Sequence, residues 1–280
     1  MTTETAIVSG IRINAHSATY GVLRAGAALC FIGHGAFGFI TKEAWVPYFA
    51  VVGINETSAY RLMPLIGAID VLAGMAVLFA PRGLPLLYMV IWATWTALLR
   101  PLAGEPFFET LERAGNYGVP LALMLLTGMP RTVGGLGQLL DAPVAGEREV
   151  ALVREVLKWT TVLLLLGHGA LGAITNKAML TSHYAAVGLP AETTVLVGWF
   201  EIALAAAIAM RPWAGLLMFA FAWKLATEFL FIAAGAPMWE FVERAGSYAA
   251  PLALALIMMK GTDAGSPLPA SSLPGQVSRG

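Results

Sequence analysis

Two histidines lie within stretches that are otherwise apolar enough to be membrane helices. The first is in GHGAFGFITKEAW (residues 33–45) and the second in GHGALGAITNKAM (residues 167–179). An ionisable side chain inside a bilayer costs about 2.5–3.5 kcal/mol on the insertion scale, so it usually faces a bundle interior and has a partner. His34 and His168 are therefore the first candidates for ligand or proton chemistry.

Each histidine has a candidate acidic partner in another apolar stretch, Asp70 for the first and Glu201 for the second. At 1.5 Å per helical residue, His34 and Asp70 lie roughly 10 and 12 Å below the same membrane edge. The functional interpretation is a ligand or proton site built from these pairs in the outer leaflet. The alternative is that each histidine donates to its own carboxylate and only joins two helices.

More polar residues are expected near this layer. Lys224 and Glu228 are four residues apart on one helix and can form an ion pair. They replace Ala93 and Ala97 of the first half, so the second half is expected to be the more specialised ligand or proton site. The candidates that complete the layer are Thr96, Tyr117, Lys224, Thr227, Glu228 and Tyr248.

Glycines surround both histidines, and they permit two interpretations. Small residues allow two helix backbones to pack closely, and they also leave room for a flat cofactor such as a quinone head group. A neutral imidazole can also bind haem iron. A haem b held by His34 and His168 is the less favoured cofactor, because no further haem motif accompanies them. The glycines are Gly33, Gly35, Gly38, Gly167, Gly169 and Gly172.

A second motif recurs as GEPFFETLERAGNY (residues 104–117) and GAPMWEFVERAGSY (residues 235–248). It can simply start a helix at the membrane surface, with acidic residues near the helix N-terminus and ion pairs at i,i+4. It can also form the outer rim of a site whose floor is the His–acid pairs. The rim candidates are Glu109, Glu112, Arg113, Glu240, Glu243 and Arg244.

The composition of the 280-residue chain indicates an integral membrane protein. It is 58% hydrophobic and 12% charged, with a mean hydropathy of +0.73, whereas soluble domains carry about 25% charged residues. The net charge is zero, which argues against a nucleic-acid partner. One cysteine, Cys30, permits no internal disulfide and no cysteine-based metal cage.

Eight apolar segments divide the chain into two halves that resemble each other. The two glycine–histidine segments agree at 8 of 13 positions and the ERAG segments at 8 of 14. These matches predict an all-α polytopic fold of about eight transmembrane helices, as two parallel four-helix repeats related by an axis along the membrane normal. The apolar segments are 22–41, 62–80, 84–103, 114–129, 157–175, 194–210, 213–234 and 246–260.

The expected domain organisation follows from these segments. The predicted parts are a cytoplasmic N-terminal segment (1–21), a first membrane repeat (22–130), a cytoplasmic linker (131–156), a second membrane repeat (157–260) and a disordered tail (261–280). With the N-terminus inside, ten Lys and Arg residues lie on the inner side and six on the outer side. This bias predicts a multi-pass protein of the inner membrane with both termini in the cytoplasm.

The four-helix module resembles the DoxX/DoxD-like family. The resemblance rests on the glycine-rich first helix, the loops ending in YFAVVGI and HYAAVGL, and the segments LIGAIDVLAGMAVLFAP and LVGWFEIALAAAIAMRP. It covers about 105 residues of each half. Members are commonly single modules, so the fused pair departs from the pattern. The family is linked with membrane oxidoreductase complexes, including thiosulfate:quinone oxidoreductase, and supplies no residue roles to transfer.

Three functional interpretations remain open at this stage. The first is a subunit of, or partner to, a quinone- or thiol-linked oxidoreductase. The second is a proton-coupled carrier or channel for a small solute, which parallel repeats with a polar layer also suit. The third is a non-catalytic assembly factor. The expected partners are the lipid bilayer and a redox complex, and the sequence indicates no oligomeric state.

Overall fold

The computed structural model describes the backbone of residues 3–130, 132–140 and 145–263. In these ranges the chain is built from helices, with one isolated bridge between Arg82 and Leu139 and no extended strand. The helices are α1 (Thr3–Ile40), α2 (Val46–Val51), α3 (Glu56–Phe79), α4 (Gly83–Leu102), α5 (Phe108–Glu112), α6 (Ala114–Leu126), α7 (Glu147–Ala173), α8 (Ala178–Ala186), α9 (Thr193–Met210), α10 (Ala214–Ala233), α11 (Met238–Glu243) and α12 (Ala245–Asp263), with 3-10 turns η1 (Glu43–Trp45) and η2 (Gly134–Gly137).

Seven of the eight predicted apolar segments coincide largely with helices of 18 residues or more, whereas the segment 114–129 coincides with α6, which has 13 residues. The helix ends also differ from the expectation. Helix α1 begins at Thr3, so the segment predicted at 1–21 is already helical from that residue. Helix α7 begins at Glu147, inside the predicted linker. The short helices α2, α5, α8 and α11 were not predicted. Most of the predicted disordered tail, residues 264–280, lies outside the described residues.

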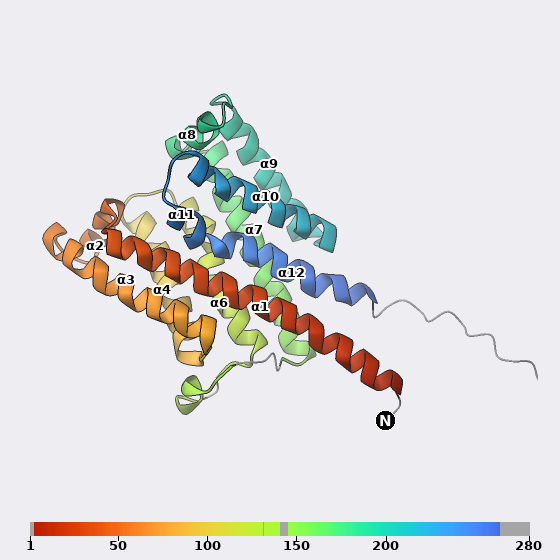
Figure 1. The fold of residues 1–280 in the computed structure, drawn as a ribbon. Coiled ribbons are helices and arrows are strands. Elements are labelled where there is room, and N and C mark those ends of the chain that lie inside the picture. The colour runs from red at the N-terminus through yellow and green to blue at the C-terminus, as the bar shows by residue number, and fades with distance from the viewer. Residues whose placement is uncertain (1–2, 131, 141–144, 264–280) are drawn as a thin grey trace, which may run out of the picture.

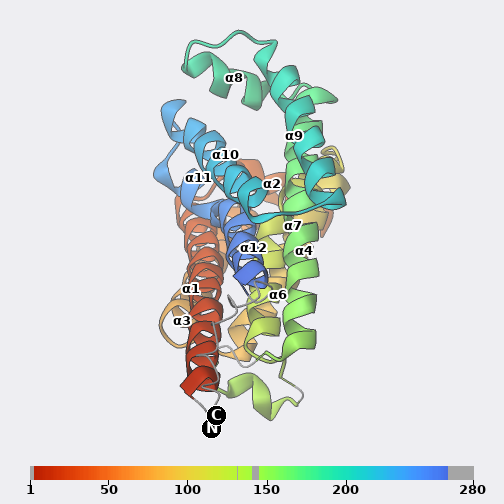
Figure 2. The same ribbon diagram turned by 90° about the vertical axis from the view of Figure 1, so that its right-hand side faces the viewer.

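Helices α1, α6, α7 and α12 form the centre of the bundle (Figures 1 and 2). Helix α3 packs along α1, and α9 packs along α7. The pair α3 and α4 lies on one side of the centre and the pair α9 and α10 on the other (Figure 1). Helix α1 begins and α12 ends on the same side of the bundle (Figure 1). This arrangement places the first and second halves of the chain in contact through their central helices.

Glycines allow close contact between the backbones of α6 and α12, which belong to different halves of the chain. A Cβ atom on Gly115 of α6 would lie 2.5 Å from the carbonyl carbon of Gly246 of α12. A Cβ atom on Gly246 would meet the carbonyl carbon of Gly115 at the same distance. Only residues without a side chain fit here, because real Cβ atoms do not approach backbone this closely. The two ERAG motifs therefore meet at their own glycines.

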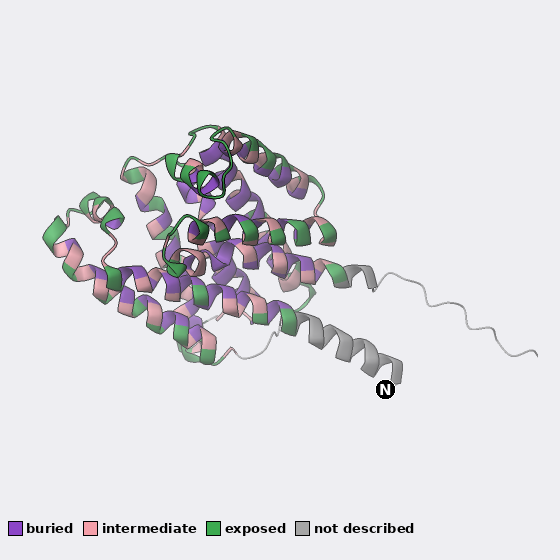
Figure 3. Cartoon of the chain, turned by 45° about the horizontal axis from the view of Figure 1, so that its top comes forward, coloured by how far each residue is buried: buried purple, intermediate pink, exposed green. Residues whose placement is uncertain are grey.

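Exposed residues lie on the outward faces of the outer helices (Figure 3), and many of them are large and apolar. Leu72 is 69% exposed, Phe79 70%, Leu196 70% and Met210 80%. Such faces suit lipid rather than water. Six helical stretches are long and apolar enough to cross a membrane: Ser17–Ile40, Glu56–Phe79, Gly83–Leu102, Thr193–Met210, Ala214–Ala233 and Met238–Met259. The chain is thus an all-helical protein with the character of an integral membrane protein.

Candidate ligand site beside His34

His34 is held by a buried hydrogen-bond network that joins three helices. Its Nδ1 atom lies 2.7 Å from Oδ2 of Asp70 on α3. The hydroxyl of Tyr88 on α4 donates to the other carboxylate oxygen, Oδ1, at 2.6 Å. Asp70 has no exposed surface, so both oxygens have their partners inside the protein. The network fixes the orientation of the imidazole and leaves its Nε2 atom for another partner.

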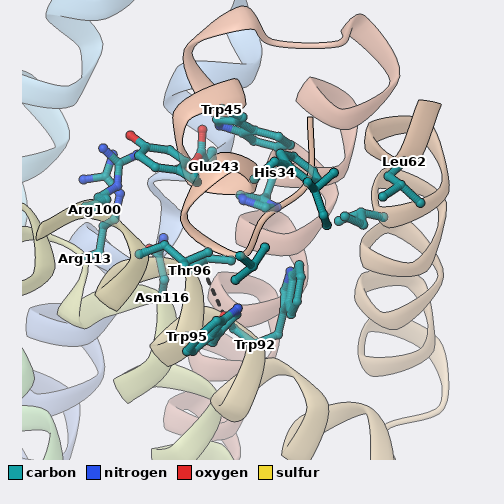
Figure 4. A pocket seen from close by; sticks show the side chains of 16 residues that line it. His34, Trp45, Leu62, Trp92, Trp95, Thr96, Arg100, Arg113, Asn116 and Glu243 are labelled. Carbon is teal, nitrogen blue, oxygen red and sulfur yellow. Dashed lines mark hydrogen bonds between the residues drawn. The ribbon is translucent and has the colours of Figure 1, made fainter. Parts of the chain in front are cut away.

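A cavity of about 280 Å³ opens beside His34. Six of the sixteen residues that line it have aromatic rings, counting His34, and Figure 4 labels four of them, His34, Trp45, Trp92 and Trp95. The imidazole stacks on Trp45, with 4.5 Å between ring centroids and 24° between ring planes. The other aromatic residues that line the cavity are Tyr48, Phe49, Trp92 and Trp95. Stacked and edge-on aromatic walls of this kind suit a flat ligand.

The segment from η1 to α2 covers one side of the cavity and supplies Trp45, Tyr48 and Phe49. The hydroxyl of Tyr48 donates to Glu105, and the guanidinium of Arg100 lies 5.1 Å from the centre of the Tyr48 ring. Burial raises the pKa of Tyr48, and the neighbouring Glu105 adds to this effect against the opposing charge of Arg100. The phenol therefore stays protonated and keeps its hydrogen bond at neutral pH.

The lipid-facing side of the cavity is formed by α3 and α4. Leu62 and Ile66 of α3 line the cavity and alternate with Leu65 and Ile69, which are 58% and 43% exposed. Trp95 of α4 lines the cavity and is itself 40% exposed. This wall of the cavity therefore borders the apolar outer surface of the bundle.

Polar groups gather at the other end of the cavity. Arg100, Arg113, Asn116 and Glu243 contribute to the lining, and Figure 4 shows the two arginines together on the side away from Leu62. Glu243 belongs to the second half of the chain, so both halves build this site. The hydroxyl of Thr96, also in the lining, donates within its own helix to the carbonyl of Trp92 at 3.1 Å.

His168 has a comparable pair but different surroundings. Its Nδ1 atom contacts Oε2 of Glu201, whose Oε1 accepts from Nε1 of Trp223 at 2.9 Å. Nζ of Lys224 lies 3.8 Å from Glu201 and 2.9 Å from Glu228, which confirms the predicted Lys224–Glu228 pair. These groups are almost fully buried and compensate one another.

The sequence favoured the second half as the ligand site, but fifteen of the sixteen residues that line the described cavity belong to the first half. His168 is not among the described residues that line it. The extra charges of the second half pair with each other, whereas the alanines at the equivalent positions in the first half, Ala93 and Ala97, carry no polar group. A haem held between His34 and His168 finds no support in this arrangement.

The rim residues join the two halves by ion pairs. Lys42 lies 2.6 Å from Glu240, and Lys177 contacts Glu109, so each half supplies a lysine to the ERAG motif of the other. The expected i,i+4 pairs are present, with N–O distances of 3.1 Å for Arg113–Glu109 and 3.8 Å for Arg244–Glu240. Glu112 pairs with Arg113. These contacts support the structural interpretation of the motif.

Three further predicted layer residues, besides Thr96, hydrogen-bond to backbone. The hydroxyls of Tyr117 and Tyr248, expected to point toward the polar layer, donate to carbonyls of the preceding short helices, at Thr110 and Phe241. Both residues lie seven positions after the carbonyl that they bind. Thr227 donates to the carbonyl of Lys224 at 3.2 Å. Their bonds brace α5, α11 and α10, and none of the three is in the described cavity lining.

The glycines around the histidines serve helix packing. A Cβ atom on Gly33 would collide with the backbone of Glu243, and one on Gly167 with the backbone of Glu112. Gly35 lies against Gly67 of α3, and Gly169 lies against Gly198 of α9. These contacts leave no room for a flat cofactor on the glycine face. The ligand site is instead on the imidazole side of α1.

Several cavity residues were not predicted as site residues. Trp45, Tyr48, Arg100 and Asn116 lie in or near the segments that join the long helices, and nothing in their spacing links them to His34. Trp92 matches Trp223 in the other half, which alone indicates core packing. Comparison with family models, with curated proteins and with solved structures finds no significant match for the chain.

Proposed function

We propose that this protein is a membrane subunit of, or partner to, a quinone-linked oxidoreductase, and that it binds a quinone head group beside His34. The observation that carries the proposal is a histidine fixed by a buried aspartate, in an aromatic cavity whose wall borders the lipid-facing surface. The DoxX/DoxD-like resemblance of the sequence agrees with this class of function. A quinone is soluble in lipid, so it can reach the cavity from the membrane.

The chemistry of a quinone ring matches the cavity lining. The ring is flat and apolar on its faces, which suits stacking between tryptophans. Its carbonyl oxygens need hydrogen-bond donors, and His34 and the arginines stand at the cavity wall. The isoprenoid tail can leave between Leu62, Ile66 and Trp95 into lipid. Asp70 is positioned to stabilise a proton on His34 when the ring accepts a hydrogen bond.

The position of the cysteine favours a quinone-linked oxidoreductase over a thiol-linked one. Cys30 is the only cysteine of the chain and is 2% exposed. It lies in the core beside Phe31 and Ala27, and it is not in the described lining of the cavity. A thiol-linked reaction would therefore depend on a thiol from another molecule.

The full membrane architecture is part of the proposal. Eight crossings in two parallel repeats are supported by reciprocal contacts: Gly33 with Glu243, and Gly167 with Glu112. Helices α6 and α7 then cross the membrane at the centre of the bundle. Helix α6 has 13 residues and relies on α5 to complete its crossing. The Lys and Arg bias supports an inner-membrane protein with both termini in the cytoplasm.

A proton-coupled carrier is the second candidate, because the buried group of Glu201, Lys224 and Glu228 resembles the ionisable clusters of proton pathways. Its charges are paired within the described structure, which fits a structural role equally well. An assembly factor without a ligand remains the third candidate. A quinone bound in the His34 cavity would distinguish the oxidoreductase subunit from both the carrier and the assembly factor.

The proposal is tested by purification in a mild detergent followed by mass spectrometry of bound small molecules. We expect a quinone to co-purify with the wild-type protein and to be lost from His34→Ala. The matched control is His168→Ala, which alters the same residue type outside the cavity and should retain the quinone. Equal loss from both variants, or no quinone in the wild type, would count against the proposal.

A further inference from the structure

Two buried polar atoms in the lining of the His34 cavity have no hydrogen-bond partner among the described residues. They are Nε1 of Trp92, a donor, and Oε2 of Glu243, an acceptor. A buried polar atom without a partner is costly, so it usually indicates a missing water or ligand. The equivalent atoms in the other half are satisfied, and the differences between the halves explain why.

The tryptophans differ because of their neighbours on the same helix. In the second half Trp223 donates to Glu201 at 2.9 Å. In the first half the equivalent carboxylate, Asp70, is occupied by Tyr88, which stands where the second half has Phe219. The indole N–H of Trp92 is thereby left without its internal acceptor.

The glutamates differ because of the buried charges of α10. In the first half Glu112 pairs with Arg113, the next residue of the ERAG motif. In the second half the corresponding Arg244 is drawn to Glu228, with its Nε atom 3.0 Å from Oε2. Glu228 replaces Ala97, and no cation of the described chain lies within ion-pair distance of Glu243. Glu243 is 5% exposed and lines the cavity.

From these differences we infer that the cavity binds the reduced form, a hydroquinone, in preference to the quinone. A hydroquinone hydroxyl can donate to Oε2 of Glu243 while a ring oxygen accepts from Nε1 of Trp92. A quinone has only acceptors, so it would place a carbonyl oxygen against the carboxylate and leave Glu243 without a donor. The inference rests on the proposed quinone site and adds its redox preference.

The inference also gives the extra charges of the second half a role. Lys224 and Glu228 stand outside the described lining of the cavity, yet Glu228 holds Arg244 away from Glu243. The second half of the chain thus influences the His34 cavity through Arg244. Glu228 is a positioning residue in this account, and Glu243 is the group that contacts the ligand.

The test measures binding of a short-chain ubiquinone and of its hydroquinone, under anaerobic conditions, by quenching of tryptophan fluorescence. We expect the wild type to bind the hydroquinone about tenfold more tightly, since a hydrogen bond to a charged group contributes that much to discrimination. Glu243→Gln should remove most of this preference, because the neutral amide can donate to a quinone carbonyl; quinone binding should tighten and hydroquinone binding should weaken. Glu112→Gln, the same change at the matched position, should keep the preference.

A second variant covers the case in which Glu243→Gln fails to fold. Replacing Lys224 and Glu228 together by alanine restores the residues of the first half and frees Arg244 to pair with Glu243. The hydroquinone preference should fall here too, although no residue of the cavity lining has changed.

Equal binding of both forms by the wild type would overturn the inference and leave the quinone site standing. A preference that survives in both variants would also overturn it. If the wild type binds neither form, the proposed function itself is wrong.

Discussion

Gly33 of α1 lies directly against the backbone of Glu243 at the end of α11, too close for any side chain at position 33. This contact joins the histidine helix of the first half to the ERAG motif of the second. It explains the glycine before His34 and brings the carboxylate of Glu243 to the cavity. Gly167 makes the same contact with Glu112, so each half of the chain depends on the other for its packing.

Gly33→Ala is therefore expected to destabilise the protein. The added methyl group must displace backbone of α11, and overpacking of this kind costs about 1–3 kcal/mol. Thermal unfolding in detergent should show a clear loss relative to the wild type. Gly21→Ala is the control, because Gly21 is in the same helix with open space around its Cα, and alanine there should be neutral or mildly stabilising. Equal melting of the two variants would contradict the packing account.

His34→Ala and His168→Ala are expected to differ in kind. The first should lower quinone affinity by about tenfold or more, the amount of one lost hydrogen bond or stacking contact, while Asp70 keeps its bond from Tyr88. Both variants remove a buried partner from a carboxylate, Asp70 or Glu201, so both should lower stability. His168→Ala should leave quinone affinity unchanged, because His168 is not among the described residues that line the cavity. Quinone titration and thermal unfolding of both variants separate these effects. A larger loss of quinone affinity for His168→Ala than for His34→Ala would show that the site lies in the second half and would contradict the account.

The double variant Asp70→Glu with Tyr88→Phe copies the second half into the first. The longer carboxylate should then accept from Nε1 of Trp92, as Glu201 accepts from Trp223. Ligand affinity should fall because the indole N–H of Trp92 then bonds to the new glutamate and no longer to the ligand. The single variant Tyr88→Phe serves as the comparison, because it keeps Asp70, whose side chain is shorter than that of glutamate. Unchanged affinity in the double variant would show that the indole N–H does not contact the ligand.

The proposed orientation is tested by labelling in intact cells with a membrane-impermeant maleimide. Glu56→Cys should be labelled from outside and Glu147→Cys should not, because they are assigned to opposite sides and both are exposed. The wild type is the background control, since its only cysteine, Cys30, is buried. Labelling of Glu147→Cys but not of Glu56→Cys would show that the protein has the opposite orientation in the membrane.

The sequence predicts the helical framework well and the cavity poorly, for physical reasons. Apolar length and glycine spacing are local features, so the long helices and the pairs His34–Asp70 and His168–Glu201 follow from depth alone. The cavity depends on the path of the segment from η1 to α2, which stacks Trp45 on His34, and periodicity carries no signal for that path. The extra charges of Lys224 and Glu228 suggested a ligand. Lys224 also contacts Glu201 of α9 and Glu228 also contacts Arg244, and spacing along one helix does not predict these contacts.

The central claim is that a quinone ring binds beside His34, and labelling by a photoreactive quinone analogue tests it most directly. After irradiation of the purified protein, the modified peptide is identified by mass spectrometry, with excess unmodified quinone as competitor. The account predicts competed labelling on residues of η1, α2 or α4 that line the cavity, such as Trp45, Phe49 or Trp95. Labelling confined to α7 and α10 around His168 and Lys224, or labelling that excess quinone does not reduce, would contradict it.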